Sequence, residues 1–303
     1  CIRDRYMVAD TDAWAFHQEP VNGVNETDRS SGKSVTGPLY GTLCPYYRKL
    51  AVESDVYEVP TVSIYIPAYN AEKTILDAVE SALNQTFKDL EVCICDDGSS
   101  DGTVKLLEKY YSNNPRVRWI SQKNKGIGGA SNTALELCKG IYIGQLDSDD
   151  ILASDVVEKC VPYFEKDMKV GLVYTTYENE NIDGSITPGY NYPVYTREKL
   201  TTAMIAHHFR MFRRRDWARV RFNERIKNAV DYDFYLRLSE ICEAHHLNII
   251  GYRRRLHGEN TSLKDNHVQN LNAAKAVNES LARQDVGLFC YLEDEHSPKL
   301  SFR

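Results

Sequence analysis

The sequence predicts an α/β fold in which a mostly parallel central sheet is flanked by helices. Segments of strand and helix character alternate from Thr61 to Asp150, and the connections between them are short. Short apolar runs rich in β-branched residues indicate strands, whereas apolar residues repeated every three or four positions indicate one face of a helix. A chain that alternates in this way forms parallel strands joined by right-handed helical crossovers.

The individual elements follow from these patterns. In the first half, strands are expected at 62–66, 90–95, 117–120 and 141–146, separated by helices at 71–84, 101–111 and 129–138. Pro67 is expected to end the first of these strands. The pattern is looser after Asp150, where the expected elements are a helix at 154–165, a strand at 170–176, a loop at 179–193, helices near 197–206 and at 229–242, a strand at 248–252, a loop at 253–263 and a helix at 265–284.

Composition divides the chain into three parts. The segment 22–38 is polar and rich in residues that break secondary structure, which is typical of a loop or linker. We therefore expect an N-terminal segment over 1–59, one α/β domain over 60–285 and a C-terminal tail over 286–303.

The overall composition is that of an ordinary soluble globular protein. The 303 residues are 42% hydrophobic and 26% charged. A formal net charge of −6 argues against nucleic acid as a partner. No apolar run approaches the roughly 18 residues of a membrane-spanning helix. The N-terminus, residues 1–5, lacks the apolar core of a signal peptide and an initiator Met, which favours a fragment of a longer chain.

The eight cysteines are scattered along the chain, and only Cys93 and Cys95 are close enough to share one face of a strand. None of them has the C-x₂-C spacing of a zinc site. Reduced, partly buried thiols in a cytosolic protein are expected.

An acidic run at the end of the fourth predicted strand is the most informative segment. The apolar residues of 141–146 lead directly into Asp147, Asp149 and Asp150. Ligands bind outside the carboxyl ends of strands in open α/β sheets. Three adjacent carboxylates repel one another unless a cation or hydrogen-bond donors hold them, and oxygen ligands suit Mg²⁺ or Mn²⁺ with substrate phosphates. The alternative interpretation is a solvated helix N-cap before Ile151.

A second acidic pair, Asp96 and Asp97, ends the second predicted strand and precedes Gly98. An acid in this place can accept hydrogen bonds from a base or from ribose hydroxyls; the alternative, a turn with a capping box, explains only 99–103. The glycines of 126–129 follow the third strand and indicate a tight entry to a helix near which phosphates would lie. Fingerprints of nicotinamide-binding and P-loop proteins are absent from the sequence.

These motifs together resemble family 2 inverting glycosyltransferases with the GT-A fold. The resemblance covers about 60–285 and rests on Ile-x-Ile-Pro-Ala-Tyr-Asn over 64–70, Asp-Asp-Gly-Ser-Ser-Asp-Gly-Thr over 96–103 and Asp-Ser-Asp over 147–149. Further segments resemble the second catalytic module of bacterial chondroitin and hyaluronan synthases, namely 122–126, 142–150, 207–212, 228–233 and 256–262. Residues 16–20 and 25–29 resemble the tail of the preceding module of such synthases.

The resemblance implies a role for each matching residue. It implies a nucleotide-sugar site formed by Pro67, Ala68, Tyr69, Asp97, Asn124, Gly126, Asp147 and Ser148. It also implies that Mn²⁺ or Mg²⁺ is bound by Asp149 and His257, with Asp147 on the metal or ribose side. Imidazole tolerates Mn²⁺ better than Mg²⁺.

Inverting transfer needs one base that deprotonates the acceptor hydroxyl. The resemblance places the family's Glu-Asp pair at Val230 and Asp231, so Asp231 is the expected base although the Glu is replaced by Val. Asp233 is the alternative base, or simply an acid favoured in the first turn of a helix.

Two basic runs, 213–215 and 253–255, have two interpretations. Arginine binds carboxylates through two hydrogen bonds, so a glucuronate or an acidic polysaccharide is one partner; a solvated charged face is the other interpretation. Trp217 is expected in the core rather than against an acceptor sugar.

The leading hypothesis is a metal-dependent enzyme that transfers glucuronic acid from UDP-glucuronic acid to a glycosaminoglycan-type oligosaccharide. A UDP-N-acetylhexosamine donor, a nucleotidyltransferase and a catalytically silent glycan-binding or scaffolding module are the alternatives. A partner glycosyltransferase or a preceding module would supply the alternating sugar. The expected location is cytoplasmic, with peripheral attachment to the inner membrane through partners.

Overall fold

The computed structural model describes residues 59–192, 194–257, 266–293 and 300–303. The predicted N-terminal segment therefore lies outside the described residues, apart from Val59. No helix of the described part combines the length and the apolar character needed to cross a membrane.

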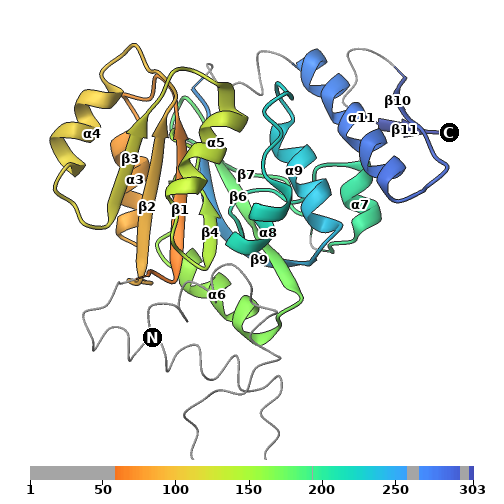
Figure 1. The fold of residues 1–303 in the computed structure, drawn as a ribbon, viewed down its shortest axis with the longest axis horizontal. Helices are drawn as coiled ribbons and strands as arrows, with labels where there is room; N and C mark the ends of the chain where they lie inside the picture. Colours follow the sequence, from red (N-terminus) through yellow and green to blue (C-terminus); the bar gives the residue numbers. More distant parts are fainter. Residues whose placement is uncertain (1–58, 193, 258–265, 294–299) are drawn as a thin grey trace, which may run out of the picture. The chain divides into compact units, whose positions relative to one another are not determined.

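The predicted parallel half of the sheet is confirmed. Strands β1 (Val62–Ala68), β2 (Leu90–Asp96), β3 (Val117–Ser121) and β4 (Tyr142–Gln145) lie in the order β3-β2-β1-β4, and all their pairings are parallel. The crossovers are α3 (Ile75–Leu83), α4 (Thr103–Tyr111) and α5 (Gly126–Leu137) (Figure 1). The carboxyl ends of β1, β2 and β4 therefore meet at one edge.

The second half continues the same sheet with mixed directions. The strands are β5 (Ile151–Leu152), β6 (Val170–Glu180), β7 (Ile186–Pro188), β8 (Arg210–Arg213) and β9 (Glu243–Arg255). Strand β8 is antiparallel to both β4 and β6, whereas β6 and β9 are parallel. The helices of this half are α6 (Val156–Lys166), α7 (Arg197–Thr202), α8 (Arg214–Val220), α9 (Val230–Ser239) and α11 (Asn266–Arg283).

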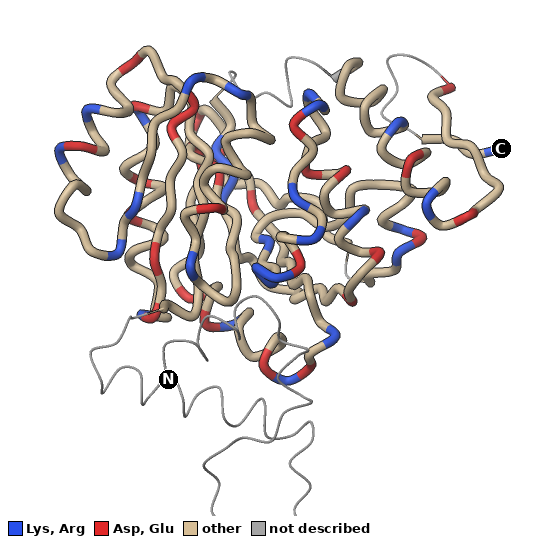
Figure 2. Tube along the Cα trace, viewed as in Figure 1, with Lys and Arg blue, Asp and Glu red and all other residues tan. Residues whose placement is uncertain are grey.

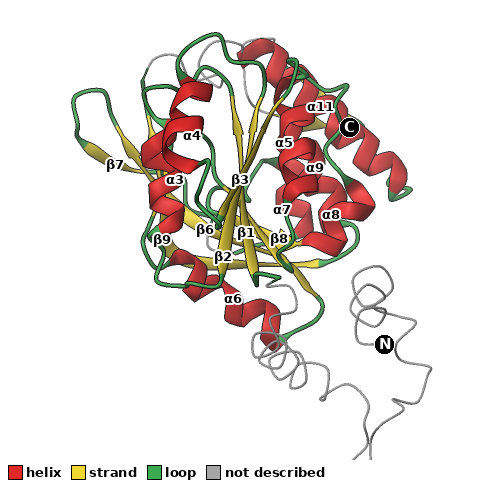
Figure 3. Ribbon diagram, turned by 60° about the vertical axis from the view of Figure 1, so that its left-hand side comes forward, coloured by secondary structure: helices red, strands yellow, loops and turns green. Residues whose placement is uncertain are grey.

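Helices cover both faces of the sheet, which separates two apolar clusters (Figure 3). One cluster packs α3 and α6 against the sheet and includes Ile75 and Phe164. The other packs α5, α9 and α11, and includes Phe234 and Val277. Full burial of each such side chain contributes about 1.5–3 kcal/mol. Charges of both signs are dispersed along the described trace (Figure 2).

Several predictions differ from the structure. Pro67 lies inside β1 rather than ending it. The carbonyl of Tyr65 accepts a hydrogen bond from the Leu146 amide, so the backbone groups of Tyr65 face β4. Those of Pro67, two residues later, face the same side. The pairing of β1 with β4 has already ended at Tyr65. The missing N–H of Pro67 therefore interrupts no ladder.

The other differences are omissions or extensions. Strand β7 lies in the predicted loop 179–193, β9 is longer than the predicted 248–252, and β8 with α8 was not expected. The predicted tail contains a hairpin of β10 (Cys290–Leu292) and β11 (Leu300–Phe302). Trp217 is buried in the core as expected, and the described cysteines are free thiols.

A substitution in β4 tests how tightly the central sheet is packed. A Cβ at Gly144 would meet Ile64 Cδ1 at 2.5 Å and Phe209 Cζ at 2.7 Å. Gly144→Ala should therefore lower the free energy of unfolding by about 1–3 kcal/mol because the core is overpacked. Urea denaturation measures this change. Gly287→Ala is the control, since a Cβ there meets no atom within 4 Å; equal stability of the two variants would contradict the packing.

Candidate active site

The three acids of the run 147–150 have three different environments. Asp150 is buried and accepts hydrogen bonds from Tyr252 Oη and the Arg255 amide, each at 2.8 Å. Asp149 Oδ2 lies 2.8 Å from His257 Nε2. The helix N-cap interpretation is wrong, because the following residues form β5 instead of a helix. Asp150 thus joins the acidic loop to β9. The side chains of Asp147 and Asp149 are partly exposed.

Asp147 and Asp149 have the chemistry of a divalent-cation site. Burial and the charge of Asp149 raise the pKa of Asp147 to about 6. The carboxylate of Asp149 and the imidazole of His257 are a donor pair that Mn²⁺ accepts. Among the described residues no group of three or more acidic, His or Cys side chains is gathered for a metal. The residues fit a cation that a substrate's phosphates would help to hold.

Asp231 lies in the first turn of α9, and its carboxylate is held by a buried arginine. Asp231 Oδ2 is 3.1 Å from Arg210 Nη1; the Arg210 side chain is 2% exposed, whereas the Asp231 side chain is 37% exposed. Although burial alone lowers it, the charge of Asp231 holds the pKa of Arg210 above its ordinary value. Arg210 therefore fixes one side of Asp231, while the other side stays accessible.

Arg210 also connects Asp231 to the end of β4. Its Nη1 donates to Gln145 Oε1 at 3.4 Å, and Tyr235 Oη donates to the same oxygen at 2.9 Å. The guanidinium lies over the Tyr235 ring, 4.8 Å from its centroid. Tyr65 is buried beside this group, and burial raises the pKa of its phenol. A polar cluster thus lies directly under Asp147 and Asp231.

Asp233 does not serve as the base. Its side chain is 1% exposed, and Arg237 Nε lies 3.1 Å from Asp233 Oδ2. An acid that is buried and paired in this way has no path to a substrate hydroxyl.

The residues predicted for the nucleotide surround the carboxyl ends of β1 and β2. Tyr69 follows β1 and is exposed. Asp97 Oδ1 accepts hydrogen bonds from Gln122 Nε2 at 2.7 Å and from the Lys125 amide at 2.9 Å. Asn124 Nδ2 donates to the Asp97 carbonyl at 2.9 Å. Asp97 and Asn124 therefore hold the loop 122–126 against β2.

Other predicted nucleotide-site residues lie close by. The Asp97 amide donates to the Ala68 carbonyl at 2.8 Å, which joins the ends of the two strands. Gly126 begins α5 with φ of +77°, a conformation that favours glycine. Ser148 lies between the two acids of the candidate cation site, half-buried.

Three arginines of the basic runs are paired within the fold. Arg213 is buried and donates to the carbonyls of Phe164 and Val170. Arg253 pairs with Glu178, and Arg255 Nη1 lies 2.7 Å from Asp77 Oδ2. These arginines join elements of the fold, which contradicts the glucuronate interpretation for them.

The sequence reasoning missed the roles of several site residues in 207–212, although it singled out that segment as a motif. His208 Nε2 lies 3.9 Å from Asp147 Oδ2, and its ring stacks on Tyr252. His207 lies among Tyr177, Tyr190 and Tyr192, with ring centroids 5.3–5.9 Å away.

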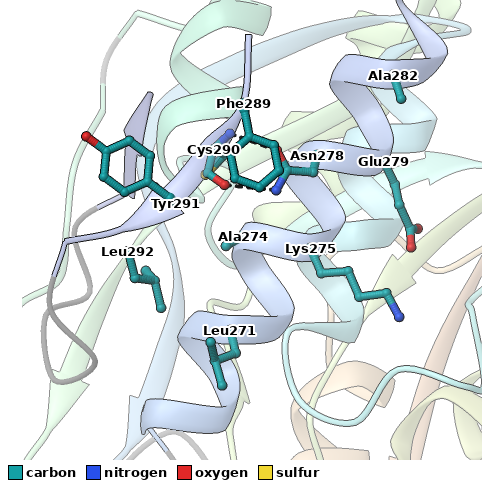
Figure 4. Close-up of a pocket in the computed structure, with 10 residues that line it drawn as sticks. All are labelled: Leu271, Ala274, Lys275, Asn278, Glu279, Ala282, Phe289, Cys290, Tyr291 and Leu292. Atoms are coloured by element: carbon teal, nitrogen blue, oxygen red, sulfur yellow. Dashed lines mark hydrogen bonds between the residues drawn. The ribbon is translucent and has the colours of Figure 1, made fainter. Parts of the chain in front are cut away.

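A groove between α11 and β10 contains none of these residues. Leu271, Ala274, Phe289 and Tyr291 line part of it, and the Asn278 side chain bonds the backbone of Cys290 across it (Figure 4). The groove is apolar and open, so the candidate reaction site is the polar edge of the sheet.

Fold and site together define a glycosyltransferase. The family model for glycosyl transferase family 2 matches residues 63–221. This chain belongs to that family.

The chain is also similar to two curated bacterial synthases. Over 284 residues the chain is 57% identical to chondroitin synthase of Escherichia coli and 55% identical to hyaluronan synthase of Pasteurella multocida. These alignments cover 92% of this chain but 41% and 29% of the two relatives. The chain thus spans less than half the length of these curated relatives.

Solved structures confirm the GT-A fold. S. aureus TarS 1-349 in complex with UDP-GlcNAc has a TM-score of 0.58 at 20% identity, over 74% of this chain and 72% of that chain. The mannosyltransferase PcManGT from Pyrobaculum calidifontis, in complex with GDP-Man and Mn²⁺, has a TM-score of 0.56 at 18% identity, over 82% and 72%.

The environment of His207 predicts a pH dependence of stability. Burial and the charge of Arg210 lower the pKa of His207 to about 4, from 6.5. The unfolded state binds the His207 proton more tightly than the folded state does. The free energy of unfolding is therefore highest above pH 6.5, and this stability is lost as the pH falls from 6.5 through about 4. Relative to His207→Phe, the wild type should lose about 3 kcal/mol of unfolding free energy between pH 7 and pH 4.

Denaturant titrations of both proteins at several pH values measure this difference. His267→Phe, on α11, serves as a second variant. Parallel stability curves for the wild type and His207→Phe would contradict the assigned environment.

Proposed function

We propose that this chain transfers one sugar, with glucuronic acid favoured, from a UDP-sugar to the non-reducing end of a glycosaminoglycan-type glycan, with inversion at the anomeric carbon. The observation that carries the proposal is the position of Asp231. Its Oδ2 atom lies 3.1 Å from Nη1 of the buried Arg210. Asp231 is at the same edge of the sheet as Asp147 and the Asp149–His257 pair. The proposed base and the acids that would act on the diphosphate would thus serve one site.

The chemistry needs a single displacement. Asp231 accepts the proton of the acceptor hydroxyl, whose oxygen attacks the anomeric carbon opposite the bond to UDP. The new C–O bond forms as the bond to the phosphate oxygen breaks, and UDP leaves with the electron pair. Arg210 would hold the Asp231 carboxylate from one side and so orient it toward the acceptor.

The acids at the end of β4 would act on the leaving group. Asp149 and His257, with Asp147 on the ribose side, would hold Mn²⁺ or Mg²⁺. A bound cation would neutralise the charge that builds on the diphosphate. A Mn²⁺ complex among structures of the same fold supports this assignment.

The nucleotide would lie along the ends of β1 and β2. Tyr69 presents an exposed ring after Pro67 and Ala68, which suits stacking on uracil. Asp97 would accept hydrogen bonds from the base or ribose, with Asn124 and Gly126 shaping its loop. The TarS complex with UDP-GlcNAc supports a nucleotide-sugar donor in this fold.

The identity of the glycan is proposed from the relatives. Both are named as synthases of chondroitin or hyaluronan, and the chain matches a fraction of each. We infer that it corresponds to their second, glucuronic acid-transferring module. One such site adds a single sugar, so a partner glycosyltransferase or a preceding module would add the N-acetylhexosamine, with any membrane attachment made through such partners.

The first test measures UDP release with Mn²⁺, with UDP-glucuronic acid, UDP-GlcNAc and UDP-GalNAc offered separately. Each donor is tested with and without chondroitin and hyaluronan oligosaccharides. Acceptor-dependent release from UDP-glucuronic acid, abolished by EDTA and restored by Mn²⁺, is expected. Release from an N-acetylhexosamine donor would overturn the donor assignment, and silence with every donor would favour the glycan-binding module.

The base assignment predicts the effect of Asp231→Asn. An amide cannot accept the proton, so kcat should fall by about 10²–10⁴ with little change in the KM for the donor. The control is Asp233→Asn in the same helical turn, which should lose stability by breaking the pair with Arg237 but keep kcat when folded. A normal kcat for Asp231→Asn would assign the base elsewhere.

A further inference from the structure

We propose that Tyr190, Tyr192 and His207 form a subsite for one pyranose ring of the acceptor glycan; we call these three residues the aromatic shelf. This inference rests on the proposed function and adds a binding role for residues outside the machinery described above.

The rings of the aromatic shelf are nearly parallel. Tyr190 and Tyr192 have interplanar angles of 28° and 22° with His207, at centroid distances of 5.9 and 5.7 Å. The ring centroids of the two tyrosines are 6.4 Å apart. The buried Tyr177 lies against His207 at 5.3 Å and supports it from the β6 side. The shelf is therefore a packed group of rings rather than single side chains.

The outer ring of this group is unusually open. Tyr190 is 68% exposed, although its neighbours in the shelf are partly buried. A phenol ring combines an apolar face with a hydroxyl at its edge. That combination suits a pyranose, whose C–H face packs on a ring while its hydroxyls bond to polar groups.

His207 contributes a neutral ring to the shelf. Burial and Arg210 lower its pKa to about 4, so the imidazole is uncharged at neutral pH. A neutral imidazole offers one hydrogen-bond donor and one acceptor. The shelf therefore matches the hydroxyl and amide groups of a sugar better than it matches a free anion.

The chain places the shelf beside the reacting groups. The residue after His207 lies 3.9 Å from Asp147, and Arg210, three residues on, lies 3.1 Å from Asp231. A sugar on the shelf is thus near the base that takes the acceptor proton.

Two hydrogen-bonded links hold the shelf loop in place. Asn191 Nδ2, between the two tyrosines, donates to Asn248 Oδ1 at 3.0 Å on β9. The Gly189 amide, just before Tyr190, donates to the Tyr177 carbonyl at 2.9 Å on β6. The segment 189–192 is therefore tied to β6 and β9 of the sheet.

The test compares Tyr190→Ala, Tyr190→Phe and the wild type at saturating donor. Tyr190→Ala should raise the acceptor KM roughly tenfold, the scale expected for the loss of one stacked ring. Tyr190→Phe should retain most of the affinity, because it keeps the ring. The donor KM, kcat and melting temperature should stay within twofold or a few degrees of the wild type. The control is Tyr110→Ala, a 51% exposed tyrosine on α4.

Direct binding of the oligosaccharide separates this inference from the proposed function. Saturation-transfer NMR with a chondroitin oligosaccharide in the presence of UDP reports contact with the shelf without turnover. Weaker binding to Tyr190→Ala with no transfer by the wild type would overturn the proposed function but support the shelf. An unchanged acceptor KM in Tyr190→Ala, or no binding by the wild type, would overturn the shelf.

Discussion

The ion pair between Arg210 and Asp231 is the interaction on which the candidate site depends. A guanidinium buried to 2% exposure costs several kcal/mol unless charges and acceptors surround it. Asp231, Gln145 and the Tyr235 ring meet that requirement from α9 and β4. The same contacts set the position of α9 relative to the sheet edge. The proposed base, Asp231, is therefore oriented by the buried charge of Arg210.

The acidic run shows why spacing alone does not assign roles. Asp147, Asp149 and Asp150 are adjacent, yet one joins β9, one pairs with His257 and one lies beside His208. Their partners lie some 60 to 108 residues further along the chain. Each role is therefore set by how β8 and β9 return to the end of β4, which local sequence does not encode.

The same reasoning explains what the sequence predicted well. The parallel half follows a regular alternation of apolar runs, so its strands and the acids at their ends were predicted correctly. Strand β8 has only four residues, and its two arginines are buried. Arg210 donates to the nearby Ala206 carbonyl and pairs with Asp231, whereas Arg213 donates to the distant Phe164 carbonyl. A pattern based on hydrophobicity treats such residues as surface. The roles of Arg210 and His208, and the shelf around His207, were missed for this reason.

In the first turn of α9, burial and pairing favour one acid as the proposed base. Val230, at the position where the family carries Glu, is buried and lies 3.3 Å from where a Cβ on Gly128 of α5 would lie. A carboxylate at that position would be desolvated against the helix. Asp233 is paired with Arg237. Only Asp231 among these three positions is both partly exposed and held by a cation. Val230 thus leaves Asp231 as the proposed base in this turn, and a single displacement needs one base.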